Sequence, residues 1–96
     1  MTVAQIKLKL YEAQKGRDAL RVSVLRYLLA AINNAEIAFR TQGKMLGAAD
    51  VESIIEKQIE QRVDSIQSYK AGNRQDLVDN EAAEMRILKE LLDDAQ

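Results

Sequence analysis

The chain contains no cysteine, histidine, proline or tryptophan among its 96 residues. Without cysteine it cannot form a disulfide, use a thiolate nucleophile or bind a metal through sulfur. Without histidine it lacks the commonest general base and metal ligand. With no proline and only four glycines, little in the sequence interrupts a helix. These absences predict an all-α fold.

Long apolar runs are also missing. The longest uninterrupted one is Tyr27–Ile32, which is far shorter than the ~20 residues that span a bilayer. Met1 leads directly into an amphipathic pattern, whereas a secretory signal has a basic segment followed by an apolar one. We therefore expect no membrane association and a cytoplasmic location.

Hydrophobic residues make up 47% of the chain and charged residues 30%, the balance of a globular protein. A chain of this length is too short for two independent cores, so we expect a single domain over residues 1–96. Apolar residues recur at helical spacing in four segments. The predicted fold is a compact bundle of four helices, at about 2–15, 18–40, 48–71 and 74–92.

The second predicted helix organises the others. Its apolar residues cover an arc about 200° wide, whereas a surface helix needs an arc of only about 100°. We therefore expect neighbours on at least two of its sides. Thr2 and Asp18 are predicted N-caps, Gly16 is predicted to end the first helix in the left-handed conformation, and Asn73 is predicted to cap the fourth helix.

Six polar or charged side chains project into the apolar arcs of three predicted helices. They are Arg21 and Glu36 on the second helix, Gln58 and Arg62 on the third, and Glu81 and Glu84 on the fourth. Burying such groups singly is costly, so they must pair, line a polar pocket or reach outward to solvent. A carboxylate metal site would normally include histidine, and arginines compete for the same oxygens. We predict no metal and no cofactor.

The charge is divided unevenly along the chain. Residues 1–46 hold eight Lys or Arg against three acids, whereas residues 47–96 hold six against twelve. This asymmetry can mark a surface for an anionic partner, or two halves that attract each other when folded. The candidate basic surface consists of Lys7, Lys9, Lys15, Arg17, Arg26, Arg40 and Lys44.

Catalytic patterns are not recognisable. The serines have no histidine partner, and no glycine-rich loop follows a strand to hold a phosphate. Tyr11, Tyr27 and Tyr69 are interpreted as core or rim residues rather than as base-stacking platforms. On its residues alone, the sequence indicates a binding or accessory domain.

Several stretches together resemble the YqeY-like proteins of the GatB/YqeY family, which are related to the B subunit of the tRNA-dependent Asn/Gln amidotransferase. They are RVSVLR at 21–26, AAINNAE at 30–36, KQIEQRVDSI at 57–66, YKAG at 69–72, RQDL at 74–77, and ExxExxIL at 81–88. They follow the family's order over nearly the whole chain.

The resemblance implies an all-helical N-terminal domain. It links the chain to glutamine-dependent amidation of aminoacyl-tRNA, the chemistry of a carbon–nitrogen ligase with glutamine as amido-N-donor. The catalytic motifs of that chemistry belong to other domains and subunits and do not occur here. Family members typically continue past a Tyr-Leu-Pro segment into a C-terminal tail domain. This chain has LLDDAQ at 91–96, so we expect that domain to be absent.

Two functional hypotheses follow, and a third, amidotransferase or ligase activity, would require a catalytic residue that is not recognisable in the sequence. The first is a non-catalytic accessory module that binds tRNA, or associates with the amidotransferase and aminoacyl-tRNA machinery, through the basic surface; DNA is not expected as a partner. The second is a protein-interaction or self-assembly domain with an internal Arg/Glu ion-pair network. In that case an apolar stripe of Ala4, Leu8 and Tyr11 on the first helix would provide the contact.

Overall fold

The computed structural model describes residues 1–95, which form four helices and no strand. Their bounds are α1 (Val3–Lys15), α2 (Ala19–Thr41), α3 (Ala48–Ala71) and α4 (Gln75–Asp94). The predicted all-α bundle is confirmed, and each helix begins and ends within two residues of its predicted bounds.

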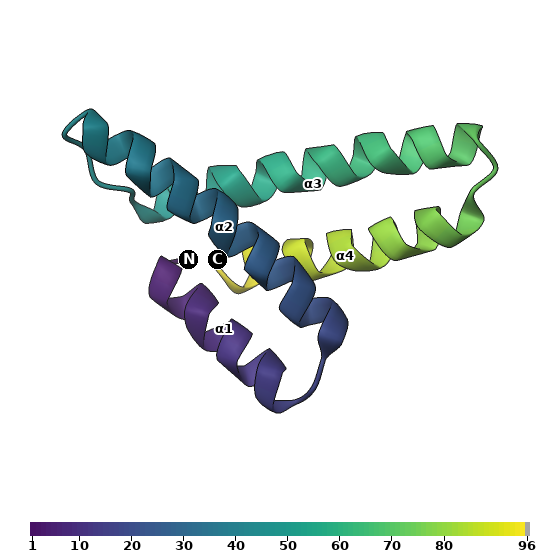
Figure 1. Ribbon diagram of the computed structural model, residues 1–96, viewed down its shortest axis with the longest axis horizontal. Coiled ribbons are helices and arrows are strands. Elements are labelled where there is room, and N and C mark those ends of the chain that lie inside the picture. The colour runs from purple at the N-terminus through teal and green to yellow at the C-terminus, as the bar shows by residue number, and fades with distance from the viewer. Residues whose placement is uncertain (96) are drawn as a thin grey trace.

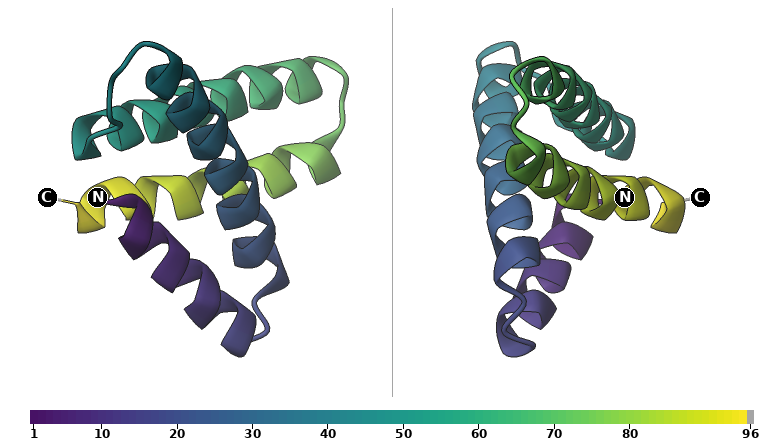
Figure 2. Two further views of the ribbon diagram at one scale, coloured as in Figure 1. Left: turned by 60° about the vertical axis from the view of Figure 1, so that its left-hand side comes forward. Right: turned by 90° about the vertical axis from the view of Figure 1, so that its right-hand side faces the viewer.

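The helices form two hairpins that cross each other (Figure 1). In one, α1 and α2 meet at the connection around residues 16–18, and in the other α3 and α4 run side by side as an antiparallel pair. Figure 2 shows α2 crossing the α3–α4 pair at a steep angle. The far ends of α3 and α4 project beyond α2, which contributes to the elongated extents of 46 × 31 × 23 Å.

The core lies where α2 meets the other three helices. Val24, Leu25, Leu28 and Ile32 of α2 are almost fully buried. Each other helix contributes at least one side chain of the same kind, and these include Ile6, Val51, Ile55 and Leu88. By length and composition alone α2 is apolar enough to cross a membrane, but these four residues make it the central core helix of the bundle.

Two predicted N-caps are confirmed. The Thr2 hydroxyl accepts a hydrogen bond from the Gln5 backbone N–H at 3.2 Å, and the Gln5 side chain accepts one from the Thr2 N–H at 2.8 Å. The Asp18 carboxylate accepts from the Arg21 N–H at 3.0 Å. These contacts satisfy backbone donors that the first turn of a helix leaves unpaired.

Two other end predictions differ from the structure. Gly16 is the C-cap of α1, as predicted, but it has φ −79°, and the left-handed residue is Arg17 at φ 56°. The reason is that Asp18 N–H donates to Ala13 O at 3.0 Å, which places Arg17 at the position that reverses the chain. In the same way Asn73 is left-handed, also at φ 56°, and Arg74 is the N-cap of α4. The connections α1–α2 and α3–α4 thus share a glycine followed by a left-handed residue.

Candidate functional site

Arg62 on α3 joins two glutamates of α4 inside the second hairpin. Its Nη1 lies 3.1 Å from Glu81 Oε2 and 3.1 Å from Glu84 Oε2. The exposed fractions of the three side chains are 20%, 13% and 14%. Because Glu81 and Glu84 are one helical turn apart, one guanidinium can hold both. We call these three residues the Arg62 cluster.

Gln58 lies one turn before Arg62 and is only 5% exposed. Its Oε1 and the Arg62 Nε are both buried without a hydrogen-bond partner among residues 1–95. The polar interior of this region is therefore only partly satisfied, which makes it less rigid than a fully bonded network.

The structure does not bring Arg21 and Glu36 to the Arg62 cluster. Arg21 pairs with Asp18 at 3.3 Å and with Glu90 at 3.0 Å, near the surface between α2 and α4. Glu36 lies in a hollow beside Lys7 and Arg40. The helical projection gave both residues inward angles, but each lies at the edge of the contacts of α2 and is partly exposed.

Hydrogen bonds at the Arg21 site shift the pKa of Arg21 and the pKa of Asp18. The bond to Glu90 raises the pKa of Arg21 above its ordinary value. The backbone N–H of Arg21 lowers the pKa of Asp18 below its ordinary value, and the Arg21 side chain adds to this. Both shifts favour the charged forms, so this site is an ion pair that also caps a helix.

Metal binding has no visible basis in the part of the chain that the structure describes. No group of three Asp or Glu side chains within residues 1–95 is arranged to hold an ion. The two glutamates that do converge share the guanidinium of Arg62.

Most of the predicted basic surface makes no ion pair. Among the lysines and arginines of the basic first half, only Lys9, at 3.0 Å from Asp94, and Arg21 form salt bridges within residues 1–95. The remaining basic side chains of that half are exposed and have no acidic partner within 4.0 Å among the residues that the structure describes. They are Lys7, Lys15, Arg17, Arg26, Arg40 and Lys44.

Five of these residues follow the line where α1 packs against α2, and we call them the basic seam: Lys7, Arg17, Arg26, Arg40 and Lys44. At one end, Lys7, Arg40 and Lys44 line a hollow of about 320 Å³. At the other end, Arg17 and Arg26 line a groove of about 810 Å³. Arg26 and Arg40 are fourteen residues apart on one helix, which corresponds to about 21 Å along its axis.

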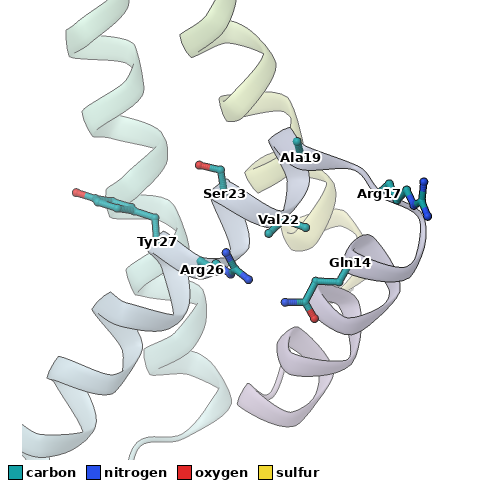
Figure 3. Close-up of a pocket in the computed structure, with 7 residues that line it drawn as sticks. All are labelled: Gln14, Arg17, Ala19, Val22, Ser23, Arg26 and Tyr27. Atoms are coloured by element: carbon teal, nitrogen blue, oxygen red, sulfur yellow. The ribbon is translucent and has the colours of Figure 1, made fainter.

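Figure 3 shows the groove at the Arg17 end. Gln14 of α1 and Arg26 of α2 point into the space between their helices, whereas Arg17 extends outward from the connection. Ser23 and Tyr27 point to the other side of α2. The seven residues lining the groove include two arginines and no acid.

Lys9 and Lys15 do not lie on the basic seam. Lys9 faces α4 through its pair with Asp94, and the Lys15 Nζ lies 5.5 Å from the centroid of the Tyr11 ring on the outer face of α1. Such a cation can be held by the ring electrostatically.

The environment of Tyr27 also differs from the sequence prediction. Its place on the apolar arc of the second helix suggested a core or rim position, but it is 58% exposed. The Arg62 guanidinium carbon lies 5.5 Å from the centroid of its ring. No sequence signal joins residues 27 and 62, because the contact depends on the crossing of α2 and α3.

The chain belongs to the family of YqeY-like proteins. The sequence model of that family, described as Yqey-like protein, matches residues 3–95. This confirms the family recognised from the sequence.

Three curated fungal relatives share the name "Altered inheritance of mitochondria protein 41, mitochondrial". The one from Lachancea thermotolerans is 40% identical over 91 residues, which is 95% of this chain and 48% of the relative. The one from Saccharomyces cerevisiae is 36% identical over 91 residues, again 95% of this chain and 48% of the relative. The one from Kluyveromyces lactis is 36% identical over 87 residues, which is 91% of this chain and 46% of the relative.

These names contradict the cytoplasmic location predicted from the sequence, since the relatives are named as mitochondrial proteins. The prediction was wrong because it rested on the lack of a secretory signal, which bears on secretion and not on import into an organelle. The chain spans about half the length of the curated relatives it matches. The division into a single domain without the family's tail stays a prediction.

Proposed function

We propose that this chain is a non-catalytic accessory module that binds RNA of the tRNA class through the basic seam. The observation that carries the proposal is the absence of ion pairs at Lys7, Arg17, Arg26, Arg40 and Lys44 within residues 1–95. If the basic first half served only to attract the acidic second half, these side chains would be paired as Lys9 and Arg21 are. Unpaired cations in a row are suited to a phosphate backbone.

The family links the proposal to aminoacyl-tRNA amidation. The resemblance connects YqeY-like proteins with the amidotransferase B subunit, so tRNA or that machinery is the partner class we propose. The charged side chains that do converge, those of the Arg62 cluster, have no free nucleophile among them. We therefore assign the module a binding role rather than the ligase reaction itself.

Salt dependence tests the proposal directly. Binding of bulk tRNA should weaken about 100-fold between about 50 and 200 mM salt if four or so phosphates are contacted, because each contact releases counterions. Arg40→Glu should weaken binding of all tRNA sequences alike. Lys89→Glu on α4 changes the net charge equally at an exposed position outside the seam, so it should have a much smaller effect.

Either of two results would exclude the basic seam as the binding surface. One is tRNA binding that is indifferent to salt. The other is an effect of Lys89→Glu as large as that of Arg40→Glu, which would show only a dependence on net charge.

A second candidate function is contact with a protein through α1. Ala4, Leu8 and Tyr11 are exposed on one face of the helix, and the exposed fractions of Leu8 and Tyr11 are 58% and 57%. The three form a short apolar stripe of the kind that partners cover. Light scattering over a range of concentrations tests the self-assembly version. A dimer that Leu8→Glu dissociates would support it, and a monomer at every concentration would exclude it.

A further inference from the structure

Tyr27 stands on the ridge between two hollows. It lines the groove of about 810 Å³ together with Ser23 and Arg26, and it also lines a second hollow, of about 300 Å³, between α2 and α3. The second hollow includes Lys57, Gln58 and Gln61 of α3. An aromatic ring more than half exposed on such a ridge can be reached by a ligand in either hollow.

Both hollows have the same chemistry. Arg17 and Arg26 line the first, and Lys57 lines the second; none of these has an acidic partner within 4.0 Å among the described residues. No aspartate or glutamate lines either hollow. Gln14, Ser23 and Gln61 add groups that both donate and accept hydrogen bonds. The surroundings of Tyr27 therefore suit an anionic ligand that also carries polar edges.

The Tyr27 ring is supported from inside. Arg62 lies over it at 5.5 Å from the ring centroid, and Arg62 is itself held by Glu81 and Glu84. The guanidinium stabilises the ring orientation through its attraction to the π-electrons. A ring fixed in this way gives an incoming planar group a surface that is already oriented.

We infer that Tyr27 is the stacking platform for one unpaired nucleotide of the bound RNA. Arg26, the adjacent residue on α2, would contact a neighbouring phosphate. Ser23, which lies one turn earlier on the same side of α2, would contact the base edge or the 2′-hydroxyl. Aromatic stacking of splayed bases with basic side chains beside them is a common mode of single-stranded RNA recognition. This inference rests on the proposed RNA-binding function.

An unpaired nucleotide suits this surface better than an acidic peptide. The apolar side chains that line the first groove include Ala19 and Val22, which are too small to form a deep socket for a peptide side chain. A base needs only the flat face that Tyr27 presents. Because a duplex keeps its bases stacked inside, the platform should distinguish unpaired RNA from paired RNA.

The absence of tryptophan allows Tyr27 itself to report binding. The chain has three tyrosines, so the double variant Tyr11→Phe/Tyr69→Phe leaves Tyr27 as the only tyrosine. Titration with a short single-stranded oligoadenylate should quench its fluorescence in a saturable manner. The same phosphate concentration of duplex RNA should leave the emission nearly unchanged.

Substitutions at Tyr27 give an independent readout. Tyr27→Leu should weaken oligoadenylate binding about tenfold, in line with the loss of one stacked base, and should leave duplex binding unchanged. Tyr27→Phe retains the ring and should bind nearly as the unmodified protein does. Circular dichroism of both variants checks that the helices are intact. The fluorescence titration needs no substitution at Tyr27, so it tests the inference even if Tyr27→Leu unfolds.

The outcomes separate this inference from the proposed function. If Arg26→Glu weakens both RNAs but Tyr27→Leu changes neither, the RNA-binding function stands and the stacking platform is wrong. If neither RNA binds, both fail. If a short polyglutamate peptide quenches Tyr27 and competes with oligoadenylate on equal terms, the site selects acidic peptides and the inference is overturned.

Discussion

The guanidinium carbon of Arg62 on α3 lies 5.5 Å from the centroid of the Tyr27 ring on α2. This contact joins the partly buried Arg62 cluster to the exposed surface that carries the basic seam. The same arginine holds Glu81 and Glu84 of α4 at 3.1 Å each. One side chain therefore connects three helices, and its removal should affect both stability and the surface.

Arg62→Met should destabilise the fold by about 2 kcal/mol, because it leaves two mostly buried carboxylates without a partner. Urea denaturation followed by circular dichroism measures the change. The triple variant Arg62→Met/Glu81→Leu/Glu84→Leu removes all the charges together and should recover most of that stability. A triple variant much less stable than Arg62→Met would contradict this argument. It would mean that the charged side chains stabilise the fold beyond offsetting the cost of burying one another.

Arg17→Gly should raise stability by about 0.5–1 kcal/mol while it weakens RNA binding. Arg17 has φ 56°, and glycine adopts this conformation without the steric cost that other residues incur. The same substitution removes a cation of the basic seam. Asn73→Gly is the matched control, because Asn73 has the same φ but asparagine tolerates it better. A loss of stability in Arg17→Gly would contradict the strain argument.

Asp18 should give the fold an acid-sensitive contribution. The Arg21 backbone N–H lowers the pKa of Asp18, so the ionised carboxylate stabilises the folded state. The contribution is complete at pH values above the ordinary aspartate pKa of about 4, which applies to the unfolded chain. It is lost as the pH falls through the lowered pKa of the folded state. Asp18→Asn keeps a capping oxygen but does not titrate.

Melting temperatures as a function of pH measure this contribution. Asp18→Asn should be less stable than the unmodified protein near neutral pH, and the difference should shrink in acid. Asp64→Asn on α3 is a control, because Asp64 is exposed and makes no side-chain hydrogen bond within residues 1–95. A difference at Asp18 that does not change with pH would exclude the carboxylate as its source.

Two substitutions on α2 should show how differently its core face and its outer face contribute to the stability of the fold. Leu28→Ala should cost about 3–5 kcal/mol, since Leu28 is fully buried and the substitution opens a cavity. Ile37→Ala, at a position that is half exposed, should change stability by less than about 1 kcal/mol. Chemical denaturation of the pair measures both values. Similar losses would mean that the outer face of α2 is covered in solution.

The polar contacts show where sequence reasoning was sufficient. The helical spacing predicted that Arg62, Glu81 and Glu84 face inward, and the structure brings these three side chains together. Arg21 and Glu36 had equally inward angles on the second helix, yet one pairs with Glu90 at the surface and the other lies beside Lys7 and Arg40. A helical projection gives the direction of a side chain but does not say which neighbour lies there.

The sequence by itself determined the local features of this protein. The four helices, the caps at Thr2 and Asp18, and the apolar face of α2 all follow from the kinds and spacing of residues within a few positions of one another. The tertiary structure decided which charges are paired and which face solvent. Because α2 crosses the α3–α4 hairpin at a steep angle, it leaves Tyr27 and the basic seam uncovered, and that crossing depends on packing between distant segments.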